Sequence, residues 1–288
     1  MLSLGVIYAV VALLGWGVGD FLIQKSTREV GSIKTLFVTG VIAFFGILPF
    51  IYHRVGDYSL QQYGYLILLS LIVLTGAIIL FEAFRTGKLT VVESVVAVEL
   101  PFTVLIALTL GGEVFSTWQM VLFVVVCVGI FLAATRRLRA SHFRGSLIEK
   151  GTILAFVAAF FSAVSNFFTG YFAATIDPLL TIWVSHSLLG FWCGLYLWYR
   201  GEFTSLMQGI KKYPVHIFGQ AALDNVAWVS FAFAASLLPI AIATTISESY
   251  IILAALLGFL LNGEKLHRHQ QVGAVVALVS VIVLSTTL

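Results

Sequence analysis

The sequence predicts an all-α membrane protein of ten transmembrane helices, arranged as two inverted repeats of five helices each. Three observations predict this fold class: an apolar composition, ten long apolar runs, and basic residues confined to alternate loops. Of the 288 residues, 60% are hydrophobic and only 10% are charged. A soluble domain has about 45–50% apolar and about 25% charged residues. A chain of this length could not hide so much apolar surface from water, so lipid must surround most of it.

Ten apolar runs have the length that a membrane helix needs, which is about 20 residues. They lie near residues 3–24, 33–53, 63–84, 90–111, 117–136, 150–174, 178–199, 214–236, 240–262 and 268–287. Irregular backbone cannot face lipid, so each run is expected to be helical. The first run lacks the basic start and the cleavage site of a signal peptide, and is therefore predicted to be the first membrane helix.

The loop charges predict the orientation. Arg54 is the only one of the 16 Lys and Arg residues that lies in an even-numbered loop or a terminal tail. Because cytoplasmic loops are rich in Lys and Arg, the odd-numbered loops are predicted to be cytoplasmic and both termini outside. We expect a multi-pass protein of the plasma (inner) membrane. The longest connector, the basic cytoplasmic linker 137–149, separates a first five-helix repeat, 1–136, from a second, 150–288.

Short motifs recur in the two halves. The matched pairs are Gly19-Asp20-Phe21 with Ser165-Asn166-Phe167, Gly112-Glu113 with Gly263-Glu264, and Gln119 with Gln270. Each half contains an odd number of predicted helices, so two tandem copies must cross the membrane in opposite directions. Such inverted repeats are common in secondary transporters, which place the substrate near the midplane between the repeats.

These motifs resemble those of a known family. The residues that carry the likeness are Trp16-Gly17, Glu99-Leu100-Pro101, Gly112-Glu113, Gln119 and Gly129, followed by Gly263-Glu264, Gln270 and Gly273. In order and duplication they are similar to the EamA-type transporters of the drug/metabolite transporter superfamily. The resemblance implies ten helices around a central cavity lined by predicted helices 1, 3, 4, 6, 8 and 9, with helices 5 and 10 peripheral. It also implies export or exchange of amino acids, metabolites, sugars or drugs.

Two acidic residues are the main candidates for the transport site. Glu99 lies about nine residues into the fourth predicted helix, roughly 14 Å deep at about 1.5 Å per residue, and Glu248 lies at a similar depth in the ninth. Ionisable side chains within the membrane usually face a cavity or a partner. We expect both carboxylates, with the neighbouring Tyr250, to approach one cavity and to bind protons, a cationic group, or both in turn. The alternative is a structural carboxyl that bonds a neighbouring helix.

A second candidate group lies on the eighth predicted helix. Gln220, Asp224 and Trp228 are spaced four apart and share one face, and Asn225 adjoins them. This face suits the lining of a site for a polar or aromatic solute, although an interhelical polar clamp would use the same residues. His186 could serve as a proton relay, but we interpret it as a hydrogen-bonded packing residue because the seventh helix is not expected to be central.

Further candidates lie nearer the cytoplasmic side. Asp20, Glu93 and Arg85 are interpreted as a gate or, equally, as a solvated rim. Glu82 and Arg85 are three apart and can pair. Glu93 is expected to lie within reach of Arg85 or Lys88 and not to share a face with Glu99.

Positions next to these were also assigned. Asp20 is expected to face Lys25. Asn166, its counterpart in the second repeat, is expected near the outer end of the cavity's opposite wall. Trp16 lies too deep for an interfacial residue, so it is a candidate for the cavity, as is Trp228; core packing explains either equally well.

Small residues four apart indicate close helix packing. The pairs are Gly15 with Gly19, Gly129 with Ala133, and Gly273 with Ala277. The last two pairs, on the fifth and tenth predicted helices, could also serve in a dimer.

The combined prediction is a secondary active transporter that exports or exchanges a small polar metabolite, such as an amino acid or amine, by alternating access and with proton coupling. The alternatives are a facilitated carrier for a sugar-like solute without proton coupling, and a membrane-embedded enzyme or lipid-handling protein. We expect no enzymatic activity, no cofactor, no metal site and no nucleic-acid partner. The expected partners are a small-molecule substrate and the lipid bilayer, with the protein as a monomer or homodimer.

Overall fold

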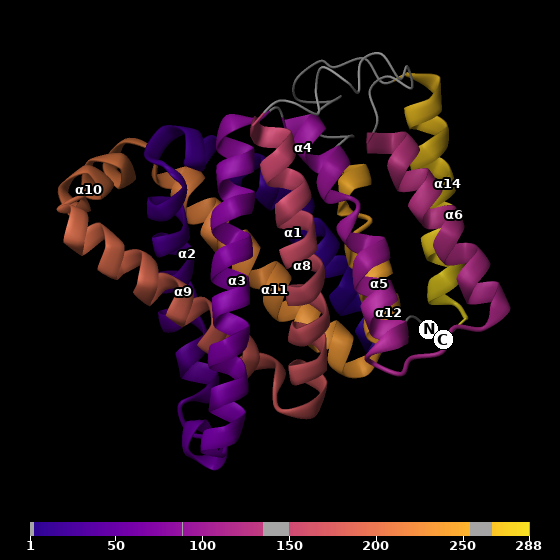
Figure 1. Cartoon of the computed structure of the whole chain (residues 1–288), viewed down its shortest axis with the longest axis horizontal. Coiled ribbons are helices and arrows are strands. Elements are labelled where there is room, and N and C mark those ends of the chain that lie inside the picture. Colours follow the sequence, from indigo (N-terminus) through magenta and orange to yellow (C-terminus); the bar gives the residue numbers. More distant parts are fainter. Residues whose placement is uncertain (1–2, 88, 135–149, 254–266, 288) are drawn as a thin grey trace.

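The computed structural model describes residues 3–87, 89–134, 150–253 and 267–287, which are helical with short connections and contain no β-strand. The first half contains α1 (Leu4–Val30), α2 (Ser32–Ile51), the 3₁₀ turn η1 (Val55–Asp57), α3 (Leu60–Thr86), α4 (Leu89–Val96), α5 (Glu99–Thr109) and α6 (Thr117–Ala134). The second half contains α8 (Lys150–Thr175), α9 (Pro178–Arg200), α10 (Phe203–Lys212), α11 (Pro214–Leu237), α12 (Ile240–Ser247) and α14 (Arg268–Ser285). The helices stand side by side, and both chain ends lie close together in the lower right of Figure 1. The predicted all-helical fold is confirmed.

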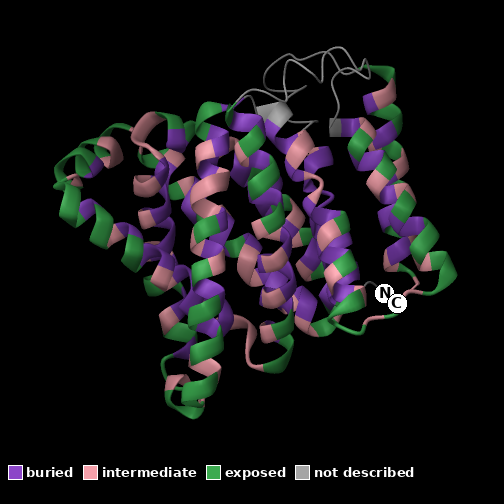
Figure 2. Cartoon of the chain, in the orientation of Figure 1, coloured by how far each residue is buried: buried purple, intermediate pink, exposed green. Residues whose placement is uncertain are grey.

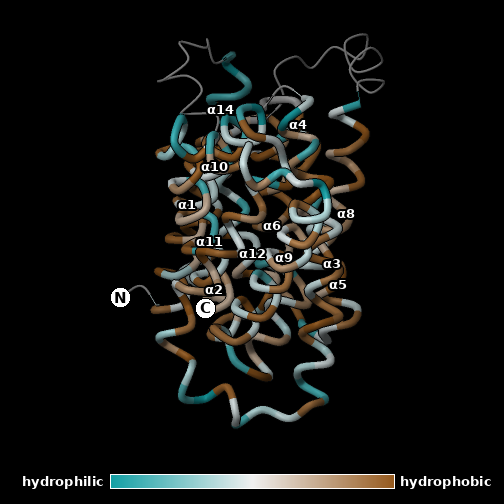
Figure 3. The backbone as a smooth tube through the Cα atoms, turned by 90° about the vertical axis from the view of Figure 1, so that its left-hand side faces the viewer, coloured by the Kyte–Doolittle hydropathy of each residue, from teal (hydrophilic) through white to brown (hydrophobic). Residues whose placement is uncertain are grey.

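The helices have the length and composition of membrane spans. Within the described residues, seven are long and apolar enough to cross a membrane, and two shorter apolar helices cover Thr117–Ala133 and Ile240–Leu253. Buried residues gather between the helices and exposed ones on the outside (Figure 2), although many of the exposed side chains are large hydrophobics. In Figure 3 hydrophobic residues dominate the middle of the bundle, while hydrophilic residues are more frequent toward its two ends. An apolar exterior of this kind is compatible with lipid and not with water.

Each long helix packs mainly against a helix of the other half. The most extensive pairings are α1 with α11, α3 with α8, α2 with α9, and α6 with α14. The two halves therefore interleave and do not form separate bodies. The pattern is also reciprocal, because exchanging each helix for its counterpart in the other half turns the α1–α11 pair into the α8–α3 pair and leaves α2–α9 and α6–α14 unchanged.

Glycine permits the closest of these approaches. A Cβ on Gly40 of α2 would lie 2.3 Å from the Cα of Gly190 on α9, so neither position can carry a side chain. A Cβ on Gly129 of α6 would lie 2.7 Å from the Cβ of Ala277 on α14. The small residues of the fifth and tenth predicted helices thus pack against each other within one chain. That occupies the face we had considered for a dimer.

One helix was not predicted. The connection between the seventh and eighth predicted spans contains α10, which buries Leu206 and leaves Met207 exposed. It ends with Lys211 and Lys212, so its composition is that of an amphipathic helix at the membrane surface. Sequence reasoning missed it because we looked only for apolar runs long enough to span the membrane.

Candidate functional site

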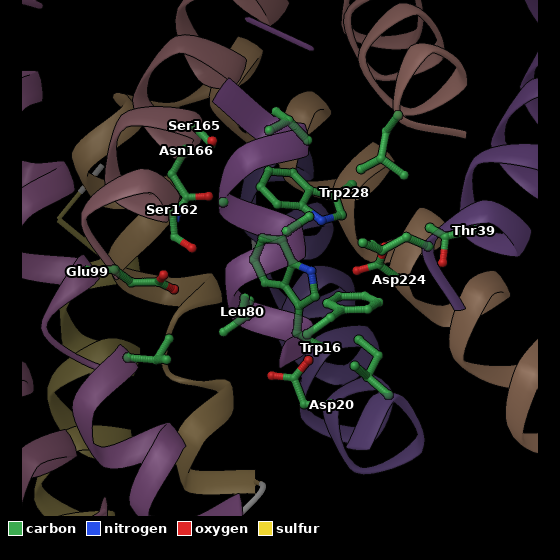
Figure 4. A pocket seen from close by; sticks show the side chains of 18 of the residues that line it. Trp16, Asp20, Thr39, Leu80, Glu99, Ser162, Ser165, Asn166, Asp224 and Trp228 are labelled. Carbon is green, nitrogen blue, oxygen red and sulfur yellow. The ribbon is translucent and has the colours of Figure 1, made fainter. Parts of the chain in front are cut away.

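A cavity lies between the two halves. The centres of water-sized molecules fit into about 80 Å³ of it, which is room for several waters. Its described lining comes from α1, α2, α3, α4, α5, α8, α9, α11 and the segment after α12. The polar and aromatic lining residues are Trp16, Asp20, Thr39, Glu99, Ser162, Ser165, Asn166, His186, Asp224, Trp228, Glu248 and Tyr250. Figure 4 shows most of them turned toward a common space.

The helix that carries Glu99 is interrupted beside the cavity. The sequence predicted one helix over 90–111, but the structure has α4 ending at Val96 and α5 beginning at Glu99. Pro101 explains the interruption, because it has no N–H to bond the carbonyl of Ala97 and its ring crowds that carbonyl. Glu99 therefore stands in the first turn of α5, where it is 5% exposed.

The second half is interrupted at the corresponding place without a proline. The run predicted over 240–262 is helical as α12 up to Ser247, turns at Glu248 and Ser249, and is helical again to residue 253, the last described residue of this part. Three side-chain hydroxyls bond backward to carbonyls four residues earlier: Thr245 at 2.6 Å, Ser247 at 2.9 Å and Ser249 at 2.8 Å. Such bonds compete with the helical pattern and bend helices. Irregular backbone within a membrane is tolerated where it is buried or lines a cavity, as it does here.

Glu99 and Glu248 meet in this cavity. Their side chains interact directly, and the Nδ2 of Asn166 donates to the Oε1 of Glu248 at 3.1 Å. The Oε2 atoms of both glutamates are buried and have no hydrogen-bond partner. Glu99 also interacts with Ser162 on α8. Asn166 thus lies beside the two glutamates on the cavity wall, and its expected place near the outer end of the cavity stays a prediction.

A second acidic group adjoins the first. The hydroxyl of Tyr250 donates to the Oε2 of Glu93 at 3.3 Å and also interacts with Asp20. Asp20 lies within electrostatic range of Glu93, Glu99 and Asp224. Both Asp20 and Glu93 are buried, at 6% and 4% exposure. Asp20 lines the cavity itself, whereas Glu93 stands behind Tyr250.

Two of the contacts expected for the gate candidates are not formed, that of Asp20 with Lys25 and that of Glu93 with Arg85. The ammonium of Lys25 lies over the ring of Phe21, 4.3 Å from its centroid, so it does not face Asp20. Arg85 forms two hydrogen bonds to Glu82, at 2.6 and 2.7 Å, and does not engage Glu93. The predicted pairing of Glu82 with Arg85 is confirmed, while Lys88 lies outside the described residues. The spacing along each helix was interpreted correctly, but which face turns inward depends on the neighbouring helices.

Two tryptophans form the aromatic wall of the cavity. Trp16 and Trp228 meet edge to face, with ring centroids 5.2 Å apart. Tyr250 and His186 extend the wall, at 6.1 Å from Trp16 and 5.8 Å from Trp228. Asp224 interacts with Trp228 and lies across the tryptophans from Glu99 in Figure 4.

Gln220 and Asn225 do not line the cavity. The amide of Gln220 donates to the hydroxyl of Thr39 at 3.2 Å and to the carbonyl of Ile217 at 3.1 Å. That of Asn225 donates to the carbonyl of Thr39 at 3.0 Å, and its oxygen lies 2.9 Å from the Nδ1 of His186. These two residues therefore join α11 to α2 and α9. That is the interhelical clamp we had considered as the alternative for this group, and only Asp224 and Trp228 of the group reach the cavity.

Sequence reasoning missed two residues. His186 lines the cavity, although we had interpreted it as a packing residue. Glu113 lies outside the cavity and accepts hydrogen bonds from the backbone N–H groups of Ile240 and Ala241, at 2.5 and 2.9 Å, so a carboxylate of the first half caps a helix of the second. The repeated Gly-Glu motif was visible in the sequence, but its partner, the start of α12, is far away along the chain.

Comparison with known proteins supports the fold and identifies the family. No curated protein matches the chain. A solved structure described only as "Crystal structure of protein" superimposes with a TM-score of 0.73 at 13% sequence identity, covering 100% of this chain and 97% of that one. At this identity the likeness concerns the fold alone.

The family model of the EamA-like transporter family matches residues 3–135 and 149–286, which is nearly the whole chain as two copies. Members of this family are membrane transporters and not enzymes. The apolar helices agree with an integral multi-pass membrane protein. The chain therefore belongs to the EamA-like transporter family, within the drug/metabolite transporter superfamily that its motifs resemble.

Proposed function

We propose that this protein is a secondary active transporter that exports or exchanges a small polar metabolite, such as an amino acid or amine, in return for protons. The observation that carries the proposal is the pair of glutamates, one from each half, that share a cavity and leave one oxygen each without a partner. A buried carboxylate is stable only when a proton or a cation neutralises it. The site therefore favours a cycle in which protons and a cationic group replace one another.

Alternating access requires that groups of helices move relative to one another about a shared site. We propose ten spans in two inverted repeats, 1–136 and 150–288, joined by the basic linker 137–149. The reciprocal pairing of helices across the two halves supports this arrangement. So do the interruptions at Glu99 and Glu248, which place non-helical backbone beside the cavity in each half.

The orientation is also a proposal. The C-terminal end of α1 and the N-terminal end of α8 lie at the edge of the bundle opposite the two termini (Figure 1). All but one of the 16 Lys and Arg residues lie in the odd-numbered loops, which include the connection after α1 and the connection before α8. We propose that the basic edge is cytoplasmic, that both termini are outside, and that the protein resides in the plasma membrane.

The test is proton-coupled transport by the full-length protein in liposomes. With a pH gradient imposed and a pH-sensitive dye inside, a panel of amino acids, amines and sugars is applied from outside. An active solute of the proposed class dissipates the gradient, whereas a sugar that moves without changing internal pH would favour a facilitated carrier. Chemical alteration of the solute, checked by mass spectrometry, would favour an enzyme.

Two variants connect the result to the site. Glu99→Gln and Glu248→Gln should each remove the proton movement and lower uptake by about 100-fold, since a neutral amide cannot exchange a proton for a cation. Glu29→Gln is the matched control, because Glu29 bonds His216 at 2.9 Å outside the cavity. Normal transport and normal proton movement in both cavity variants would contradict the proposal.

A further inference from the structure

The charge of the cavity wall is the starting point. Four carboxyl groups, those of Asp20, Glu99, Asp224 and Glu248, line the cavity. No lysine or arginine is among the described residues that line it. A ligand that enters with its own positive charge therefore meets several acceptors and no competing cation.

Two of these carboxyls each have one oxygen without a donor. The Oε2 atoms of Glu99 and Glu248 are buried, belong to side chains that are 5% and 2% exposed, and have no hydrogen-bond partner within the described part of the chain. Buried acceptors in proteins are almost always paired. An ammonium group offers three donors and one positive charge, so a single such group could satisfy both oxygens.

Asp224 offers a separate place for a positive charge. In Figure 4 it lies on the other side of Trp16 and Trp228 from Glu99, and it interacts with Trp228. The indole faces of two tryptophans are favourable surfaces for a cation. Asp20 lies below Trp16 in the same view and interacts with both acidic groups.

We propose that the cavity binds a small linear molecule with an ammonium group at each end. One ammonium binds between Glu99 and Glu248, the alkyl chain passes the two tryptophans, and the second ammonium binds beside Asp224. This inference rests on the proposed transport function and names the class of substrate.

Other kinds of cationic ligand fit the cavity less well than a diammonium compound. Among the described residues no group of three or more His, Cys, Asp or Glu side chains could hold a metal ion, so a metal has no coordination shell here. A simple alkylamine fits, but it leaves one of the two acidic places without a counter-charge.

The test is a binding comparison on the purified full-length protein in detergent, by isothermal titration calorimetry near neutral pH. The probes are straight-chain α,ω-diamines of three to six methylenes, each paired with the n-alkylamine of the same length. A second buried charge-assisted hydrogen bond predicts that the best diamine binds about 10- to 100-fold more tightly than its monoamine. Equal affinities, or no diamine binding, would overturn the proposal even if no variant could be purified.

Variants test where each of the two ammonium groups of the ligand binds. Asp224→Asn should reduce diamine affinity to that of the monoamine and leave monoamine affinity unchanged, whereas Asp224→Glu should retain the preference for the diamine. Glu99→Gln should weaken both ligands. Glu29→Gln, the control outside the cavity, should change neither. A diamine preference that survives in Asp224→Asn would contradict the proposed second position.

The two proposals fail in different ways. If liposomes show proton-coupled movement of other amines while diamines bind no better than monoamines, the transport function stands and the diammonium substrate is wrong. If diamines bind with the stated preference but no solute crosses the liposome membrane, the ligand class stands and the transport function is wrong.

Discussion

The two halves of this protein meet in two very different ways. Between α6 and α14 they touch through glycine and alanine, and the backbone of Gly273 approaches that of Gly129 so closely that a Cβ would lie 2.6 Å from a carbonyl oxygen. The described polar contact there is the amide of Gln270, which donates to the carbonyl of Ala133 at 3.1 Å. At the cavity they meet through carboxyl groups, some of whose oxygen atoms have no hydrogen-bond partner. From this difference we expect the first contact to stay fixed as a pivot during transport and the helices around the cavity to move.

The pivot can be tested by crowding it. Gly129→Leu should lower the free energy of unfolding by about 1–3 kcal/mol or more, because the new side chain would collide with Ala277 and with backbone. The matched control is Gly46→Leu on α2, where an added Cβ meets nothing within 4 Å. Thermal unfolding in detergent measures the difference. Equal stability of the two variants would mean that α6 and α14 are not held in close contact.

The role of the interruption between α4 and α5 can be tested by restoring the missing backbone hydrogen bond. Pro101→Ala restores an N–H that can bond the carbonyl of Ala97, so α4 and α5 should join and shift Glu99. Transport should fall by about tenfold, equivalent to about 1.4 kcal/mol, with folding retained. Pro49→Ala within α2 is the matched control. If transport by Pro101→Ala equals that of the wild type, the interruption is not required for movement.

A smaller effect is expected at the cap between the halves. Glu113→Ala leaves the N–H groups of Ile240 and Ala241 without their carboxylate, which should cost about 0.5–2 kcal/mol of stability. Val114→Ala, a neighbouring and exposed position, is the control. If the cap also opens during transport, the uptake rate of the Glu113→Ala variant will change as well, and rate and stability can be compared directly.

The smallest effect is expected at the membrane surface. The Nζ of Lys34 bonds Glu202 at 2.9 Å and holds the pKa of that carboxyl below its ordinary value. A lowered pKa stabilises the folded state above the ordinary pKa of Glu, about 4.3, and this stabilisation is lost as the pH falls through the folded value. The melting temperature of Glu202→Gln should therefore be slightly lower than that of the wild type at neutral pH, and the two should converge on acidification. A constant difference at all pH values would contradict the ion pair as its cause.

Much of the fold followed from local patterns. Apolar length located the helices within a few residues, and the order of the repeated motifs indicated the family, because both depend on neighbours along the chain. The same reasoning missed α10, which is too short and too polar to span. It also missed the interruption after α12, where hydroxyl groups and not a proline bend the backbone.

The candidate site could be predicted from the sequence only in part. Glu99, Glu248, Asp224, Trp16 and Trp228 could be selected because buried polar and large aromatic residues are unusual in lipid, and the structure brings them to one cavity. Their contacts could not be predicted in this way. Asn166 and Asp20 were candidates as well, but the packing of α1 and α8 decided that they meet Glu248 and Tyr250. His186 reaches the cavity through the packing of α9, and Gln220 turns away from it to bond Thr39.

The sequence by itself determined that the chain is helical, apolar on its outside and duplicated, since hydropathy and motif order are properties of the linear chain. Only the tertiary structure decided which acidic residues share a cavity and that α6 and α14 pack closely through small residues. Rotation of a helix by a few tens of degrees exchanges one face for another, and the neighbouring helices set that rotation through close packing.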